Sequence, residues 1–375
     1  MRGIIGYGTY VPYYRLDRSK ITAAMSSGGG RGHRAVAAYD EDTTTMGVEA
    51  ARNALAGSSV TPSSIWFATA NPAYLDKTNA TAIQAALDLP QDTWAVDAGG
   101  SARSAEAAIL GASGTPGVSM AVVSDLRTGN PTSNDESSGG DAAAALIFGD
   151  DDDAPVLAHA LGRAASTGEF LDRYRLPGES SSRIWEERFG EQAYLALAED
   201  AIERATKAAD VGIEDVDKVV IAGLHARAVR GLSKIAGDKL VDDLTGNIGN
   251  PGAAQLPLLV ASGRDQAAPE ATILCVHLAD GAYASVIRTT DAIATYTPFA
   301  TVESQIEGGS DNLEYNLYLT WRGFLDREPP RRPDPDRPGA PPAFRSEDWK
   351  YAFVAVSYTH LRAHETEADV VCRLL

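Results

Sequence analysis

Two residues of this sequence stand at the ends of predicted elements and carry groups that could stabilise an oxyanion. His225 directly follows the apolar run VVIAGL, and Asn247 lies in the glycine-rich turn TGNIGNPGA before an apolar helix. In layered α/β folds, ligands bind at the carboxyl ends of strands. A neutral imidazole and an amide that converge on one point can both donate to an oxygen that gains negative charge. The pair therefore predicts an oxyanion hole, whereas either residue alone fits a strand-end histidine or a turn residue equally well.

Other residues with reactive or charged side chains give weaker signals. The loop Gly28–Gly30 with the nearby Arg34 could receive a phosphate, although such a glycine run is more often a surface loop. The run Asp150–Asp153 lacks the alternating spacing of a calcium loop, which favours a solvated turn. Cys275 lies inside the apolar run ILCV, where a buried hydrophobic role is more typical than a reactive thiol. We therefore expect no metal site in this chain.

The elements that must position His225 and Asn247 alternate short apolar runs with longer amphipathic stretches. This alternation is typical of layered α/β architecture. The predicted helices are Thr43–Leu55, Thr81–Leu87, Arg103–Gly111, Ala196–Ala209 and Ala254–Ser262. The predicted strands are Ile4–Tyr7, Ile65–Ala70, Trp94–Asp97, Val118–Ser124, Ala142–Phe148, Val219–Leu224, Ile273–Leu278 and Ala284–Ile287.

The order of these elements repeats along the chain. Helix, polar turn and strand occur in EAARNALAGSSVTPSSIWFATANP and again in EDAIERATKAADVGIEDVDKVVIAGLHA. We predict two similar halves at 1–160 and 161–326, the second with a helical insertion. Val219–Leu224 should then be a central buried strand equivalent to Ile65–Ala70. The alternative is a single large α/β domain with two unrelated βα runs.

The composition changes after the second half. Residues 327–355 contain the proline-rich segment EPPRRPDPDRPGAPPAF, which predicts an extended linker leading into a further domain. Residues 356–375, VSYTHLRAHETEADVVCRLL, resemble translated sequencing adapter. We expect this tail to be non-native, with the short natural C-terminus as the alternative.

The overall composition excludes several classes of protein. Apolar residues make up 44% and charged residues 22% of the 375 residues, which is ordinary for a globular protein. The net charge of −18 argues against nonspecific binding to nucleic acid or to an anionic membrane. The start of the chain lacks the layout of a signal peptide, and two cysteines cannot build a disulfide framework. We expect a cytoplasmic protein.

The motifs taken together resemble the thiolase superfamily, in the branch of hydroxymethylglutaryl-CoA synthase and ketoacyl-ACP synthase III. The resemblance covers most of residues 1–290. It is carried by GIIGYGTYVPYYRLDR, DEDTTTMGVEAARNAL, AVDAGGSARSAEAAI, GGDAAAALIFGD, the His225 segment and GNIGNPGAA. It implies an α-β-α-β-α layered fold of two βαβ-containing halves. It also implies acyltransferase chemistry on acyl groups carried by coenzyme A or acyl carrier protein.

The resemblance also shows what this chain lacks. The nucleophilic cysteine of the family falls at Ala102, and its general-acid/base glutamate falls near Ala70 or Asn71. Only His225 and Asn247 match the family's functional residues. The resemblance thus implies that the usual acyl-cysteine mechanism is absent, and neither Ser101 nor Ser104 is an obvious replacement.

Three functions stay open on this basis. The protein could be a carbon–carbon lyase or decarboxylase that stabilises a thioester enolate, or a condensing enzyme with a nucleophile elsewhere. It could also be a noncatalytic acyl-CoA-binding subunit. Coenzyme A is expected as substrate carrier, with no covalently bound cofactor and with Arg34, Arg227 and Arg230 as its contacts. The expected partners are a second copy of the chain or a zinc-ribbon/OB-fold protein, since residues 316–355 resemble the leader of such a domain.

Overall fold

The computed structural model describes residues 2–265, 267–329, 331–332, 339–345 and 351. Nine strands form one large sheet in the order β11-β12-β13-β8-β1-β7-β6-β4-β5. The strands are β1 (Gly3–Tyr10), β2 (Tyr14–Asp17), β3 (His33–Val36), β4 (Ser64–Thr69), β5 (Trp94–Gly99), β6 (Ser119–Leu126), β7 (Asp141–Gly149), β8 (Ala158–Thr167), β9 (Arg173–Tyr174), β10 (Arg183–Ile184), β11 (Lys218–Gly223), β12 (Thr272–Leu278) and β13 (Gly281–Thr289).

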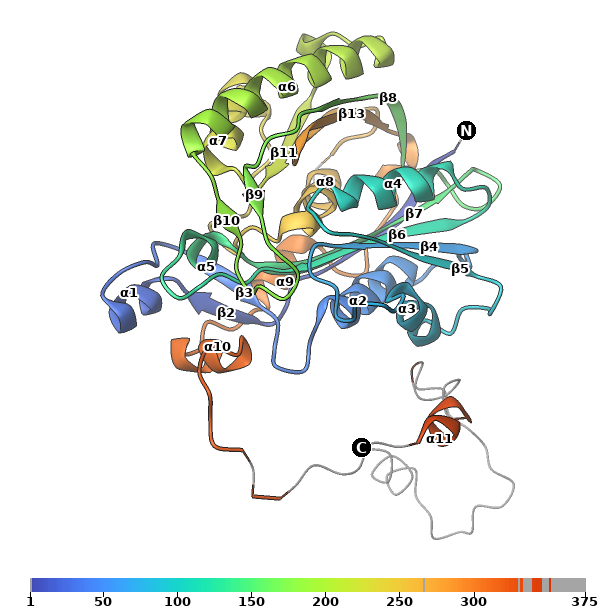
Figure 1. Ribbon diagram of the computed structural model, residues 1–375. Coiled ribbons are helices and arrows are strands. Elements are labelled where there is room, and N and C mark those ends of the chain that lie inside the picture. Colours follow the sequence, from blue (N-terminus) through green and yellow to red (C-terminus); the bar gives the residue numbers. More distant parts are fainter. Residues whose placement is uncertain (1, 266, 330, 333–338, 346–350, 352–375) are drawn as a thin grey trace, which may run out of the picture.

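Helices cover both faces of this sheet and fill the space between its two halves (Figure 1). They are α1 (Ser19–Met25), α2 (Thr43–Leu55), α3 (Ala80–Ala86), α4 (Ser104–Gly114), α5 (Asn134–Ser138), α6 (Glu187–Ala209), α7 (Ala226–Ala236), α8 (Gln255–Asp265), α9 (Val302–Glu307), α10 (Tyr315–Trp321) and α11 (Ala340–Arg345). Four short 3-10 turns lie at Ile213–Asp215, Gly237–Lys239, Gly252–Ala254 and Asp291–Ala294. None of the helices in these described ranges is long and apolar enough to cross a bilayer.

The two halves of the sheet repeat one pattern of strand directions. In the first half β4 runs parallel to β5 and β6, and β7 runs antiparallel to both of its neighbours, β6 and β1. In the second half β11 runs parallel to β12, and β13 runs antiparallel to both of its neighbours, β12 and β8. The halves meet where β1 pairs antiparallel with β8. This repeat confirms the predicted layered α/β fold.

The helices form three layers around the two halves of the sheet. α2 and α3 pack on the first half, and α6 and α7 pack on the second. α4 and α8 lie between the halves, and their alanine- and leucine-rich faces share one core cluster with β1, β6 and β7. Small side chains such as Ala108 and Ala261 let these helices approach closely. The predicted α-β-α-β-α order is therefore present.

Two details of the second half differ from the sequence-based expectation. β11 is buried as predicted, but it is an edge strand of the nine-stranded sheet and not a central one. Its outer neighbour is reduced to a single bridge between Val219 and Leu240, because the chain there turns into the loop before α8. A short hairpin of β9 and β10, which the sequence did not predict, lies between β8 and α6.

Candidate functional site

A cavity of about 540 Å³ opens where strands of both halves end. The first half contributes Asn71 after β4 and the turn Gly99–Ala102 after β5. The second half contributes Leu224 after β11 and Leu278 at the end of β12. Carboxyl ends of parallel strands are where layered α/β proteins bind ligands. We call this cavity the junction pocket.

The β9–β10 hairpin forms one wall of the junction pocket. Residues 172–179 line it, and Figure 1 shows the hairpin running from the layer of α6 and α7 toward α5. The Arg173 guanidinium pairs with the Asp135 carboxylate of α5 at 2.6 Å. Arg175 donates to the Ala70 carbonyl oxygen at 2.9 Å. These contacts fasten the hairpin to the first half and place three arginines at the pocket, since Arg127 lines it as well.

Ala102 lies in the junction pocket, in the turn that precedes α4. Its methyl side chain is buried and offers no nucleophilic atom. Ser101 also lines the pocket, and its backbone N–H donates to the Ser104 hydroxyl oxygen at 3.4 Å. The segment at which the sequence predicts a nucleophile position is therefore in the pocket, and it carries an alanine there.

His225 caps α7 directly behind the pocket wall. Its Nδ1 accepts a hydrogen bond from the Ala228 backbone N–H at 3.1 Å. A neutral ring with an accepting Nδ1 carries its proton on Nε2. That Nε2 is buried and has no hydrogen-bond partner among the described residues. The ring thus presents one free donor at the end of β11, which is the tautomer that an oxyanion donor requires.

The free Nε2 of His225 faces an acidic side chain. Asp172 Oδ1 lies 3.9 Å from it, and Tyr194 donates its hydroxyl to Asp172 Oδ2 at 3.2 Å. Burial, followed by the charge of Asp172, raises the pKa of the Tyr194 hydroxyl, so this group stays a donor. Asp172 and Tyr194 line the junction pocket, whereas His225 lies behind them. Nothing in the sequence pattern singled out either residue.

Asn247, the predicted partner of His225, is not among the residues that line the junction pocket. Its side chain is exposed, because the backbone N–H groups of Asn247 and Ile248 both bond to the Leu244 carbonyl and the tight turn buries Ile248. The second asparagine of the same motif, Asn250, donates from Nδ2 to the Gly223 carbonyl at 2.8 Å. Gly223 ends the strand that leads to His225. The amide that the structure brings to this strand end is that of Asn250.

Arg34 cannot contact coenzyme A, contrary to the expectation from the sequence. Its guanidinium is fully buried, donates to the backbone carbonyls of Glu136 and Arg127, and lies over the Tyr318 ring. Arg34 instead ties β3 to α5 and α10. The sequence suggested that Arg34 lies beside a flexible loop, but Arg34 belongs to β3 and its side chain is buried.

Arg227 and Arg230 lie on the outer face of α7, where both side chains are exposed. The Arg227 Nε lies 3.2 Å from the Glu191 carboxylate of α6. Arg230 bonds weakly to the Ala226 carbonyl of its own helix. Both remain accessible to an anionic ligand.

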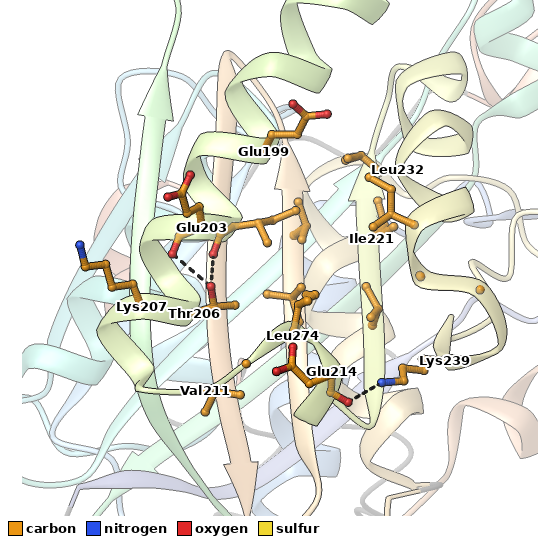
Figure 2. A pocket seen from close by; sticks show the side chains of 18 of the residues that line it. Glu199, Glu203, Thr206, Lys207, Val211, Glu214, Ile221, Leu232, Lys239 and Leu274 are labelled. Carbon is orange, nitrogen blue, oxygen red and sulfur yellow. Dashed lines mark hydrogen bonds between the residues drawn. The ribbon is translucent and has the colours of Figure 1, made fainter.

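A second cavity, of about 850 Å³, lies between α6 and α7 over the sheet. Figure 2 shows Glu199, Glu203 and Lys207 along α6 and Leu232 on α7, with Leu274 of β12 on the floor. Its floor is apolar and its rim carries both signs of charge. None of the residues with predicted chemistry lines this cavity, so it is separate from the junction pocket.

Cys275 is not placed to act as a nucleophile or as a metal ligand. It is buried in β12, and burial raises the pKa of its thiol to about 12. Cys372 falls outside the described residues. Within the ranges that the structure describes, no three His, Cys, Asp or Glu side chains gather as a metal site would require.

Comparisons with known proteins find hydroxymethylglutaryl-CoA synthases among the relatives of this chain. A scan against protein-family models finds no match. Hydroxymethylglutaryl-CoA synthase of Aeropyrum pernix is 30% identical over 349 residues, which cover 86% of this chain and 94% of the relative. The same enzyme of Pyrococcus furiosus is 30% identical over 294 residues, covering 75% of this chain and 83% of the relative.

Solved structures share the fold at lower sequence identity. A crystal structure of hydroxymethylglutaryl-CoA synthase complexed with CoA superposes with a TM-score of 0.73 at 16% identity, covering 85% of this chain and 89% of the other. A 3-oxoacyl-(acyl carrier protein) synthase III from Pseudomonas aeruginosa gives a TM-score of 0.64 at 19% identity, covering 77% and 98%. Both likenesses support the layered fold. On the identity and coverage of its relatives, the chain belongs to the hydroxymethylglutaryl-CoA synthase family.

Proposed function

We propose that this protein acts on an acyl-CoA thioester in the junction pocket and makes or breaks a carbon–carbon bond through a thioester enolate. The main observation behind this proposal is the set of residues that line the pocket. It joins the strand ends of both halves and contains Ala102, which the family resemblance puts at the position of the nucleophile. Family membership supports the thioester, and the alanine supports a reaction without an acyl-cysteine.

His225 is the proposed donor to the enolate oxygen. Its Nδ1 is held by the Ala228 N–H, which leaves the Nε2 proton free and buried. A buried, preorganised donor stabilises developing charge far better than a solvated one. We assign the second donor to Asn250 in place of Asn247, because the Asn250 amide bonds to Gly223 at the end of the strand that leads to His225.

Arginines at two places could receive the anionic parts of coenzyme A. Arg127, Arg173 and Arg175 line the junction pocket, and Arg227 and Arg230 are exposed on α7. We propose the α7 pair as the outer phosphate contacts, since both of its side chains are exposed whereas Arg173 is largely buried against Asp135. No cofactor other than the coenzyme A of the substrate enters the proposal.

A second candidate function is that of a noncatalytic acyl-CoA-binding subunit. Ala102 favours it, because loss of the family nucleophile is also what a binding subunit would tolerate. In either case we propose assembly with a second copy or with a zinc-ribbon/OB-fold protein. Residues 327–355 are the proposed linker toward such a domain, and most of them, like all of 356–375, lie outside the described residues.

Product analysis separates the two functions. The purified protein is incubated with acetyl-CoA, acetoacetyl-CoA and longer acyl-CoA thioesters, and products are followed by mass spectrometry. We expect turnover in the wild type and about a hundredfold or greater loss in His225→Ala, with thioester binding retained in calorimetry. Binding without any turnover would favour the subunit, and absence of binding would contradict both functions.

A further inference from the structure

The junction pocket contains a carboxylate that no role described so far uses. Asp172 stands between β8 and β9 and lines the pocket, although only 8% of its surface is exposed. A buried carboxylate needs partners that compensate its lost hydration. Its neighbours on the hairpin do not provide them, because Arg173 pairs with Asp135 and Arg175 bonds to Ala70.

The partners that Asp172 does have occupy only one of its oxygens. Oδ2 accepts the Tyr194 hydroxyl at 3.2 Å. Oδ1 lies 3.9 Å from His225 Nε2, which is beyond a hydrogen bond, so both atoms keep capacity for a further contact. Within the described part of the chain, no Lys or Arg forms an ion pair with Asp172. One oxygen is therefore held and the other is free.

Gly190 keeps the space between these two groups open. A Cβ on Gly190 would lie 2.8 Å from His225 Nε2 and 3.0 Å from Asp172 Oδ1. The free donor of His225 and the free oxygen of Asp172 therefore lie side by side next to α6, 3.9 Å apart. A donor and a base that share one location are the two groups that enolate formation requires.

We propose that Asp172 is the general base of this site and removes the α-proton of the acyl thioester. The inference rests on the proposed function and adds the residue that takes the proton. The Cα–H bond breaks, and its electron pair forms the C=C bond of the enolate. The carbonyl π pair moves to the oxygen, which faces His225 Nε2, and the proton moves to Asp172 Oδ1.

Asp172 suits this step better than His225 does. Asp172 lines the pocket and has a free oxygen, whereas His225 has no nitrogen free to accept a proton, because its Nδ1 accepts from Ala228 and its Nε2 already carries a proton. Tyr194 fixes the carboxylate through Oδ2 without neutralising it. The positions after β4 offer no acid for this purpose, because they hold Ala70 and Asn71.

Hydrogen–deuterium exchange at the α-carbon of acetyl-CoA tests the proposal. The wild type, Asp172→Asn and His225→Ala are incubated with acetyl-CoA in D₂O, and deuterium in the acetyl group is measured by mass spectrometry. We expect both variants to lose about a hundredfold or more of the exchange rate. Asp172→Asn keeps the size of the side chain, and calorimetry with acetyl-CoA should show binding within about threefold of the wild type.

Glu106→Gln provides the matched control. Glu106 is a second buried carboxylate beside a histidine, with His277 Nδ1 at 2.9 Å, and it lies outside the junction pocket. This variant should exchange at the wild-type rate. Wild-type exchange in Asp172→Asn, with loss in His225→Ala, would overturn the role of Asp172 and leave the proposed function standing. A wild type that binds acetyl-CoA without exchanging it would overturn both.

Discussion

The absence of one side chain keeps the space open between His225 and Asp172. Gly190 is the fourth residue of α6, a helical position at which glycine costs about 0.5–1 kcal/mol relative to alanine. A Cβ there would approach His225 Nε2 to 2.8 Å, closer than van der Waals contact allows. The glycine is therefore explained by the site and not by the helix.

Gly190→Ala should lower turnover by about tenfold or more, because the added methyl displaces the donor or the carboxylate. Circular dichroism should show the variant folded. Gly114→Ala is the control, since Gly114 also lies in a helix and a Cβ there meets nothing within 4 Å. Wild-type turnover in Gly190→Ala would mean that the space beside His225 has no role.

Thiol alkylation tests the absence of a cysteine nucleophile. With its pKa raised to about 12 by burial, the Cys275 thiol is almost wholly protonated at pH 8, and the thiolate is the form that reacts. Iodoacetamide should leave turnover unchanged, and peptide mapping should find Cys275 unmodified. Inactivation that acyl-CoA prevents, with label on Cys275, would contradict this.

Some helices and strands of this fold could be predicted from the sequence and others could not, for physical reasons. α2 begins and ends where its periodicity predicts, Thr43–Leu55, because its apolar face and its Asp42 cap agree. β8 was not predicted, since AHALGRAAST is poor in β-branched and aromatic residues; pairing with β13 and β1 overrides this weak propensity. α7 was predictable from the spacing of Val229, Leu232 and Ala236 but was missed.

The candidate site was predictable only where it follows regular elements. His225 and Ala102 could be located from the sequence because each follows a strand with a clear apolar pattern; the structure has Ala102 in the junction pocket and His225 after β11. Asp172 was not, since its hairpin has strands of two residues and no periodicity. The choice between Asn247 and Asn250 depends on turn geometry that the motif alone does not specify.

The Asp42 cap of α2 allows a test at the level of a single element. Its carboxylate accepts from the backbone N–H groups of Thr44 and Thr45 at 2.8 Å each, and Thr43 Oγ1 donates to the Asn71 carbonyl at the pocket. Asp42→Ala should lower the free energy of unfolding by about 1 kcal/mol in urea titration. Asp40→Ala, an exposed neighbour, should change it by less than about 0.5 kcal/mol. Equal effects of the two would contradict the capping role.

At the scale of the whole molecule, the junction pocket exists only because the two halves meet. Ala102 and Asn71 come from the first half, Leu224 and Leu278 from the second, and the hairpin with Asp172 crosses between them. Each half alone would present an open strand end. The layered architecture therefore assembles the pocket that we propose for the thioester, with Ala102 in its wall.

The central claim is that an acyl-CoA thioester binds in the junction pocket and reacts without an acyl-enzyme. To test it, the wild type and Ala102→Cys are incubated with acetyl-CoA, quenched with acid and weighed by mass spectrometry. Because the thioester should lie at the turn before α4, residue 102 of the variant should become acetylated. The wild type should turn over substrate with its mass unchanged. An acetyl adduct on the wild type at Cys275, formed and consumed during turnover, would contradict a reaction without an acyl-enzyme.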